Sequence, residues 1–205
     1  MEWAGDTNSL LICRSLLRFA PVNFRPPAQS DWWFFYSPRA VEFGANRLAL
    51  HSLPLPRLAA MGPGTASALA QHEYGLKADF VGQGSPAEVA RSFGKIAANC
   101  HVFFPRARQS RLTVQRLLQD TIRVQDAICY DNQAVYDPKY VAADIYVFTS
   151  PLNVRTYLTV HPLPDHARVI ALGPSTAQAL ASFGIRCEVA EESSEEAVRD
   201  LLAAG

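Results

Sequence analysis

The chain has 205 residues, of which 19 are basic and 19 are acidic, so its formal charge at pH 7 is zero. A neutral chain has no overall field that attracts nucleic acid or a membrane surface, and we expect neither as a partner. Its 49% of hydrophobic and 19% of charged residues exclude a disordered protein and fit one large domain or two small ones.

The first apolar run of the chain, Leu10–Phe19, carries Arg14 and Arg18, and this pattern does not fit a signal peptide. No run reaches the roughly 18–20 apolar residues that a membrane span requires. The start of the run, Leu10–Cys13, is strand-like, and we expect it to join a sheet that forms later in the chain. These features predict a cytoplasmic protein.

The four cysteines, Cys13, Cys100, Cys129 and Cys187, lie far apart and show no metal-ligand or redox spacing. Three of them, Cys13, Cys129 and Cys187, fall in or beside apolar, strand-like runs. Free thiols that are buried in a reducing cytosol explain this pattern best, and it predicts no metal site. The excess of Arg, sixteen against three Lys, suits an anionic ligand, but a coding bias toward Arg explains it equally well.

After a Pro-rich segment, Phe24–Trp32, short apolar runs alternate with segments whose apolar residues recur three and four positions apart. The short runs are typical of buried parallel strands, and the segments between them are typical of amphipathic helices. This alternation predicts an α/β unit with a parallel sheet that is covered on both faces. The five predicted strands are Trp32–Tyr36, Leu58–Met61, Phe80–Val81, Val102–Phe104 and Ala127–Cys129.

A polar, turn-rich segment, Cys129–Tyr140, ends this unit, and the same alternation then starts again. We predict a continuous domain over residues 27–131 and a second domain that is built from both chain ends, residues 1–23 and 135–205. The strand Leu10–Cys13 is expected to complete the second sheet. The other predicted strands of this domain are Ile145–Phe148, Val169–Leu172 and Glu188–Ala190, and its helices begin near Pro151, Pro174 and Ser194.

The two units repeat one another in sequence. The motif "FYSP" (Phe35–Pro38) matches "FTSP" (Phe148–Pro151), and "GPGTASAL" (Gly62–Leu69) matches "GPSTAQAL" (Gly173–Leu180). A weaker third pair follows in the same order. Matched blocks in one order predict that the α/β unit is duplicated.

Two interpretations fit the Ser-Pro and Gly-Pro-x-Thr turns of these blocks. In the structural interpretation, Pro begins each helix, and hydroxyls cap the amides of its first turn. The hydroxyls are those of Thr65 in the first unit and of Ser175 and Thr176 in the second. In the functional one, loops that follow parallel strands line a ligand crevice, where free amides at helix N-termini attract anions. The sequence leaves both interpretations open for any single turn.

Six segments together resemble the uroporphyrinogen-III synthase family, in the order of that family and over roughly residues 9–203. The resemblance implies an α/β fold of two flavodoxin-like parallel-sheet domains, which are joined by a two-stranded link and hold the active site in the cleft between them. The segments are "FYSPRAVEF" (Phe35–Phe43), "GPGTASAL" (Gly62–Leu69), "VFFPRA" (Val102–Ala107), "CYDN" (Cys129–Asn132), "FTSP" (Phe148–Pro151) and "GPSTAQALASFGI" (Gly173–Ile185).

The resemblance also implies a reaction. A linear hydroxymethylbilane loses water and closes to a macrocycle with its last pyrrole ring, ring D, inverted, which gives uroporphyrinogen III in haem biosynthesis. Such a lyase uses no metal and no organic cofactor, and the family implies a monomer that can receive its substrate from hydroxymethylbilane synthase. The substrate carries eight carboxylates and forms a reactive cation once hydroxide leaves, so positioning supplies most of the rate enhancement.

The tyrosine of "CYDN", Tyr130, matches the family position that donates a hydrogen bond near the leaving hydroxyl, and the resemblance makes it the catalytic residue. Its phenol has an ordinary pKa of about 10 and stays a donor at neutral pH. Each matched hydroxyl also has a capping explanation, and Arg39 and Arg108 have an explanation as solvated side chains. The substrate-binding residues that the resemblance implies are Ser37, Arg39, Gly62, Thr65, Arg106, Ser150, Asn153, Ser175 and Thr176, with Ser150 and Thr176 as the strongest contacts.

The sequence also departs from the family pattern. Family members usually begin with a strand that ends in Thr-Arg-Pro and a helix, which this sequence lacks. Gly44 interrupts a predicted helix at a typical cost of about 1 kcal/mol. An alternative function is a non-catalytic bilobal module that binds an anion or a tetrapyrrole. The sequence does not separate this alternative from the enzyme, because the reaction needs no catalytic triad or metal cluster.

Overall fold

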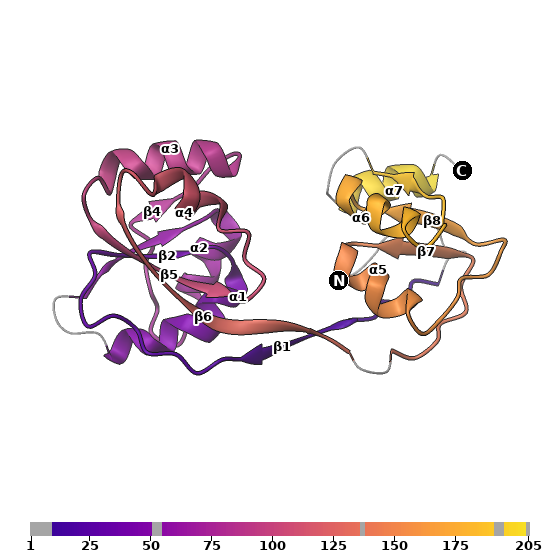
Figure 1. The fold of residues 1–205 in the computed structure, drawn as a ribbon, viewed down its shortest axis with the longest axis horizontal. Coiled ribbons are helices and arrows are strands. Elements are labelled where there is room, and N and C mark those ends of the chain that lie inside the picture. Colours follow the sequence, from indigo (N-terminus) through magenta and orange to yellow (C-terminus); the bar gives the residue numbers. More distant parts are fainter. Residues whose placement is uncertain (1–9, 51–54, 136–137, 191–194, 204–205) are drawn as a thin grey trace. The chain divides into compact units, whose positions relative to one another are not determined.

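The computed structural model describes residues 10–50, 55–135, 138–190 and 195–203. The chain divides into two compact units (Figure 1). Residues 19–132 form the continuous unit, and residues 1–18 with 133–205 form the two-segment unit. The chain passes from one unit to the other within strand β1 (Leu17–Pro21) and again within strand β6 (Arg123–Ala134). Among the described residues, no helix is long and apolar enough to span a membrane.

Strands β1 and β6 pair with each other where the chain passes between the units. The N–H of Val22 donates to the carbonyl of Cys129 at 2.9 Å, and the N–H of Val135 donates to the carbonyl of Leu16 at 3.0 Å. The partners run in opposite directions along the two strands, so the pair is antiparallel. This pair confirms the two-stranded link that the resemblance implies.

The sheet of the continuous unit has the strand order β1-β6-β5-β2-β3-β4, and strands β2 to β6 are mutually parallel. Counted from β2, this order is 3-2-1-4-5, which is the order of dinucleotide-binding sheets, whereas flavodoxin has the order 2-1-3-4-5. The doubly wound α/β class is therefore confirmed, but its flavodoxin strand order is not found in this unit. The five predicted strands are present as β2 (Trp32–Phe35), β3 (Arg57–Ala60), β4 (Phe80–Val81), β5 (His101–Ala107) and β6.

Strand β2 explains why this sheet is covered on both faces. Successive side chains of a strand point to opposite faces, so Trp32 and Phe34 join one hydrophobic core while Trp33 and Phe35 join the other. Helices α3 and α4 cover the first core, and α1 and α2 cover the second (Figure 1). The helical segments are α1 (Pro38–Gly44), a 3₁₀ turn η1 (Ala45–Leu50), α2 (Pro63–Ala70), α3 (Pro86–Ile96) and α4 (Thr113–Leu118).

A β-bulge interrupts the pairing of β5 with β6. Arg106 pairs with Ile128, but the next residue, Ala107, pairs with Tyr130, so Cys129 is an extra residue on β6. Neighbouring residues of a regular strand face opposite sides, yet Cys129 and Tyr130 both pack into the core beneath α1 and α2. The bulge therefore brings Tyr130 to the face of the sheet that α1 covers.

The two-segment unit contains a parallel sheet of the order β7-β8-β9. Tyr146 and Phe148 pack beneath α5 and α6, whereas Ile170 packs against Val198 of α7 on the opposite face. The three strands predicted after residue 140 and the predicted helix starts at Pro151 and Pro174 are confirmed, and the predicted start at Ser194 lies outside the described residues. The elements are β7 (Ile145–Phe148), α5 (Pro151–Leu158), β8 (Arg168–Ala171), α6 (Pro174–Ala181), β9 (Glu188–Val189) and α7 (Glu195–Ala203).

The duplication that the sequence predicts is present in the fold. The order β2-α1-β3-α2-β4-α3 in the continuous unit is repeated by β7-α5-β8-α6-β9-α7 in the two-segment unit. In both copies, a Ser-Pro turn begins the first helix and a Gly-Pro turn begins the second.

The prediction of a strand over Leu10–Cys13 is wrong. These residues form no strand, and Leu10 is 87% exposed. The first strand of the described part of the chain is β1, which pairs with β6, and Leu16 is the nearby residue that packs against the core of the two-segment unit. An apolar run does not reveal which backbone will be available to pair with it. The thiol of Cys13 is accordingly exposed, contrary to prediction, whereas the thiol of Cys129 is buried.

Gly44, which the sequence marks as a helix interruption, lies where α1 approaches β5. A Cβ atom at this position would come within 2.9 Å of the Cβ of Pro105, which is a buried residue of β5. We expect Gly44→Ala to lower the free energy of unfolding by about 1–2 kcal/mol, because overpacking outweighs the gain in helix propensity. Urea unfolding measures this change. The matched control is Gly64→Ala in α2, where a Cβ meets nothing within 4 Å; equal effects of the two substitutions would contradict the packing explanation.

Candidate functional site

A small pocket lies at the carboxyl edge of the sheet in the continuous unit. Ser37 follows β2, Ala107 ends β5 and Tyr130 lies on β6, and in a parallel sheet these strand ends meet at one edge. The volume of the pocket is about 200 Å³. Its lining residues are Tyr36, Ser37, Ala107, Gln109, Ser110, Arg111, Leu112, Thr113 and Tyr130. None of them is acidic.

Two aromatic rings contact the ring of Tyr130. Its ring stacks on Phe43 at 5.3 Å between centroids and tilts against Phe19 at 6.2 Å. Only 6% of the residue is exposed. Burial raises the pKa of the Tyr130 phenol above its usual value, and the hydrogen bond between Tyr130 and Ser37 partly offsets this rise. The phenol therefore stays protonated at neutral pH and can donate a hydrogen bond.

The hydroxyls of Tyr130 and Ser37 form a pair, 3.2 Å apart. The oxygen of Ser37 also accepts the N–H of Ala40, because Ser37 is the N-cap of α1. The two hydroxyls carry two protons, and one of these protons forms the hydrogen bond between the two oxygens. Whichever residue donates, the pair keeps one O–H for a ligand.

A second tyrosine, Tyr36, lines the same pocket from the opposite face of β2. Its oxygen accepts the N–H of Gln115 at 3.0 Å, and its ring lies against Phe34 and Phe104. Burial is the main cause that raises the pKa of Tyr36 to about 12. This phenol therefore also stays protonated at neutral pH and can donate a hydrogen bond.

Arg106, one of the predicted carboxylate ligands, is held inside the protein. Its guanidinium pairs with Asp126 at 2.9 Å, and Asp126 also accepts a hydrogen bond from the side chain of Gln115 at 2.9 Å. Arg106 also donates to the carbonyl of Ala107. The ion pair fixes the ends of β5 and β6 next to the pocket and leaves Arg106 little freedom to bind a carboxylate.

Two other arginines near the pocket also have carboxylate partners. Arg39 pairs with Glu42 on α1, and its guanidinium lies 4.6 Å from the centre of the Phe19 ring. Arg108 pairs with Asp131 at 3.1 Å and is half exposed, as its predicted solvated role requires. Exposed ion pairs of this kind are weak, so a ligand carboxylate can displace Glu42 from Arg39 at small cost.

The predicted capping by threonine hydroxyls is wrong for Thr65 and Thr176. The N-caps of α2 and α6 are Gly62 and Gly173, and neither helix has a side-chain cap. The threonines occupy the third helical position instead, where their side chains are 4% and 2% exposed. The amides of these two helix starts are therefore not blocked by a capping hydroxyl.

The remaining predicted residues lie in the two-segment unit, at the equivalent turns. Ser150 is the N-cap of α5 and accepts the N–H of Asn153 at 3.2 Å. The amide of the Asn153 side chain donates to the hydroxyl of Thr149 at 2.9 Å. Ser175 is exposed in the first turn of α6, next to the buried Thr176.

Comparison with known proteins identifies the family. The family model for uroporphyrinogen-III synthase (HemD) matches residues 12–199. The chain belongs to the uroporphyrinogen-III synthase family. This membership confirms the resemblance seen in the sequence motifs, and it places the chain among enzymes of haem and porphyrin biosynthesis. No curated protein sequence matched the chain.

Solved uroporphyrinogen-III synthases share the fold of the chain. The structure of the synthetase from Helicobacter pylori superposes with a TM-score of 0.70 at 20% identity, covering 92% of this chain and 90% of that one. A mutant synthase from the extremely thermophilic bacterium Thermus thermophilus gives a TM-score of 0.50 at 16% identity, covering 92% and 86%. At these identities the likeness establishes the architecture of the synthase family for this chain.

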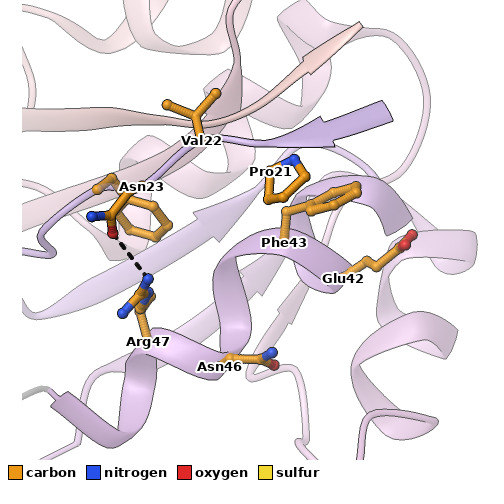
Figure 2. A pocket seen from close by; sticks show the side chains of 8 residues that line it. Pro21, Val22, Asn23, Glu42, Phe43, Asn46 and Arg47 are labelled. Atoms are coloured by element: carbon orange, nitrogen blue, oxygen red, sulfur yellow. Dashed lines mark hydrogen bonds between the residues drawn. The ribbon is translucent and has the colours of Figure 1, made fainter. Parts of the chain in front are cut away.

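A larger hollow of the continuous unit, about 530 Å³, lies between the segment Pro21–Phe24 and α1 with η1 (Figure 2). On its wall Arg47 donates to the side-chain carbonyl of Asn23 at 3.1 Å. The wall also carries the carboxylate of Glu42. None of the residues that the synthase resemblance implies lines this hollow. The smaller pocket, which holds Tyr130 and no acidic group, is therefore the better candidate for the synthase site.

Of the nine residues that line the smaller pocket, the sequence predicts Ser37 and Tyr130 as site residues and does not predict the other seven, which include Tyr36 and Arg111. The sequence does contain a signal for Tyr36. The internal repeat aligns it with Thr149, which is much smaller, so the two units differ at this position. Arg111 has no comparable signal, since it lies in the loop after β5 and outside every matched motif. Among the described residues, no cluster of His, Cys, Asp and Glu could hold a metal ion.

Proposed function

We propose that this member of the synthase family dehydrates hydroxymethylbilane and closes it, with inversion of ring D, to uroporphyrinogen III. Because the reaction eliminates water, the enzyme is a hydro-lyase. The observation that carries the proposal is the hydroxyl pair of Tyr130 and Ser37, which presents an O–H to a pocket without acidic groups. The family match over residues 12–199 supplies the reaction.

In the proposed reaction, Tyr130 donates a hydrogen bond to the hydroxyl that leaves the substrate. A protonated phenol stabilises the charge that develops on this oxygen and does not itself need to lose its proton before the bond breaks. The aromatic contacts with Phe43 and Phe19 fix the direction of the donor. The cation that remains needs no strong nucleophile, so the main task of the protein is to hold ring D against the carbon of ring A.

The other predicted residues are proposed as contacts of the substrate carboxylates. Ser37 holds Tyr130, and Arg39 is half exposed beside Glu42, its carboxylate partner on α1. The open start of α2 supports a backbone contact at Gly62 more than one through the buried side chain of Thr65. The same distinction favours Ser175 over Thr176, while Ser150 and Asn153 remain candidates. For Arg106, the ion pair with Asp126 supports a positioning role.

The test uses the purified chain and freshly prepared hydroxymethylbilane, followed by oxidation and separation of isomers I and III. Closure without an enzyme gives isomer I, so we expect isomer III to predominate and its share to rise with protein concentration. Isomer I alone at every protein concentration would contradict the proposal. Tight binding of a tetrapyrrole together with isomer I alone would support the non-catalytic alternative.

A further inference from the structure

Arg111 differs from the other arginines at this edge of the sheet. Arg39, Arg106 and Arg108 each have a carboxylate partner. Within the described part of the chain, the structure records no ion pair or hydrogen bond for the side chain of Arg111, and none of the residues that line its pocket is acidic. An exposed guanidinium on the wall of a pocket without acidic groups is available to an anion.

Tyr36 supplies a second available donor to the same pocket. Its oxygen is occupied as an acceptor by the N–H of Gln115, so the hydroxyl proton is free to point elsewhere. The described residues provide no recorded acceptor for that proton. The aromatic contacts with Phe34 and Phe104 hold the ring in place, so the donor costs little entropy when a ligand binds.

The short loop that carries Arg111 has a constrained backbone. Leu112 has φ +56°, in the left-handed region that a Leu rarely adopts. The N–H of Leu112 donates to the hydroxyl of Ser110, and Arg116 of α4 donates its N–H to the carbonyl of Leu112. The backbone on both sides of Arg111 is thus held, since Leu112 is tied to α4 and the N–H of Ser110 donates to the carbonyl of Ala107 at the end of β5. These residues line the pocket together with Tyr36 and Tyr130.

From these observations we infer that Arg111 and Tyr36 together bind one carboxylate arm of the substrate beside Tyr130. The inference rests on the proposed function for the identity of the ligand, which carries eight carboxylates. Arg111 supplies a positive charge and two parallel N–H donors to the carboxylate, and Tyr36 supplies one O–H donor. The pair would anchor the substrate while Tyr130 acts on the leaving hydroxyl. A smaller side chain such as Thr149, at the equivalent position of the other unit, could not extend a hydroxyl as far from its backbone.

The experiment compares Arg111→Gln and Tyr36→Phe with Arg116→Gln as the matched control. Arg116 is also exposed, lies on the adjacent helix and does not line the pocket. We expect Arg111→Gln to raise the KM for hydroxymethylbilane about tenfold and Tyr36→Phe to raise it several-fold, with kcat changed less than about threefold. Arg116→Gln should leave both constants unchanged. The conservative variant Arg111→Lys should restore part of the affinity, since it keeps the charge and loses the fork.

A binding titration with uroporphyrin III, a stable porphyrin with eight carboxylates, separates this inference from the proposed function. Arg111→Gln should weaken binding about tenfold and make it less dependent on salt, whereas Arg116→Gln should do neither. If wild type yields isomer III and the Arg111 and Tyr36 variants keep wild-type KM and affinity, the inference fails and the function stands. If wild type makes no isomer III but its porphyrin binding depends on Arg111 and Tyr36, the function fails and the carboxylate site stands.

Two further outcomes bear on the inference. Equal weakening by Arg111→Gln and Arg116→Gln would show a general charge effect and overturn it, as would a wild-type chain that neither binds uroporphyrin III nor turns over. Thermal melting of each variant checks folding. Because Arg111 is exposed, its substitution tests the site even if Tyr36→Phe destabilises the fold.

Discussion

Replacing Tyr130 by Phe is expected to lower the kcat for isomer III formation by about 100-fold or more, with a small change in KM. Removing one preorganised hydrogen-bond donor that faces developing charge typically lowers kcat by roughly 10²–10³-fold. Phe retains the ring that stacks on Phe43 and Phe19 and removes only the hydroxyl that pairs with Ser37. Steady-state kinetics with isomer separation measures the effect.

The control for this substitution is Tyr74→Phe, which removes a phenol that is 54% exposed in the same unit. It should leave the rate unchanged. Uroporphyrin III binding by the Tyr130→Phe protein should remain near wild type, because the proposed role concerns the leaving hydroxyl. A Tyr130→Phe enzyme with the wild-type kcat would remove Tyr130 from the catalytic assignment.

The largest loss of stability is expected from Phe93→Ala. Phe93 is fully buried on α3, and its ring lies 5.2 Å from Trp32, 5.1 Å from Phe34 and 5.1 Å from Phe80 between centroids. Removing such a ring typically costs about 3–5 kcal/mol, through lost burial and the cavity that remains. Domains are stable by only about 5–15 kcal/mol, so the continuous unit should unfold at much lower urea concentration or remain unfolded.

Tryptophan fluorescence follows this loss, because Trp32 and Trp33 both lie in the continuous unit. The matched control is Ile96→Ala at the end of the same helix α3, where the residue is 48% exposed. It should shift the unfolding midpoint little. If Phe93→Ala and Ile96→Ala produce equal shifts, the aromatic cluster around Phe93 does not stabilise the unit as the packing indicates.

Much of the architecture follows from local patterns in the sequence. The strands β2 and β7 are short apolar runs, and a Ser-Pro turn follows each of them. Because this turn fixes where the next helix begins, the end of each strand can be predicted from the sequence. The repeat of the same phrases shows that one unit occurs twice. Leu10–Cys13 shows where this approach fails. Its apolar pattern fits a strand, but pairing depends on a partner backbone, and Leu17–Pro21 has that partner in β6.

The candidate site was predicted less completely than the fold. Tyr130 and Ser37 were both identified through family motifs, and the structure places their hydroxyls 3.2 Å apart. The family motif predicts that Arg106 binds a carboxylate arm, but the register of β5 against β6 brings Asp126 to it. That register is set by tertiary pairing and by the bulge at Cys129, neither of which local periodicity reveals. Arg111 was missed for a related reason, because a lone Arg in a loop shows no pattern.

The most direct measurement uses hydroxymethylbilane labelled with ¹³C at the carbons that become the bridges of the macrocycle. Head-to-tail closure of pyrroles that all face the same way keeps fourfold symmetry, so isomer I gives one bridge signal in the NMR spectrum. Inversion of ring D breaks this symmetry. We predict several distinct bridge signals when the purified chain is present. A single signal, the same as in a reaction without protein, would contradict the proposal that this chain turns ring D.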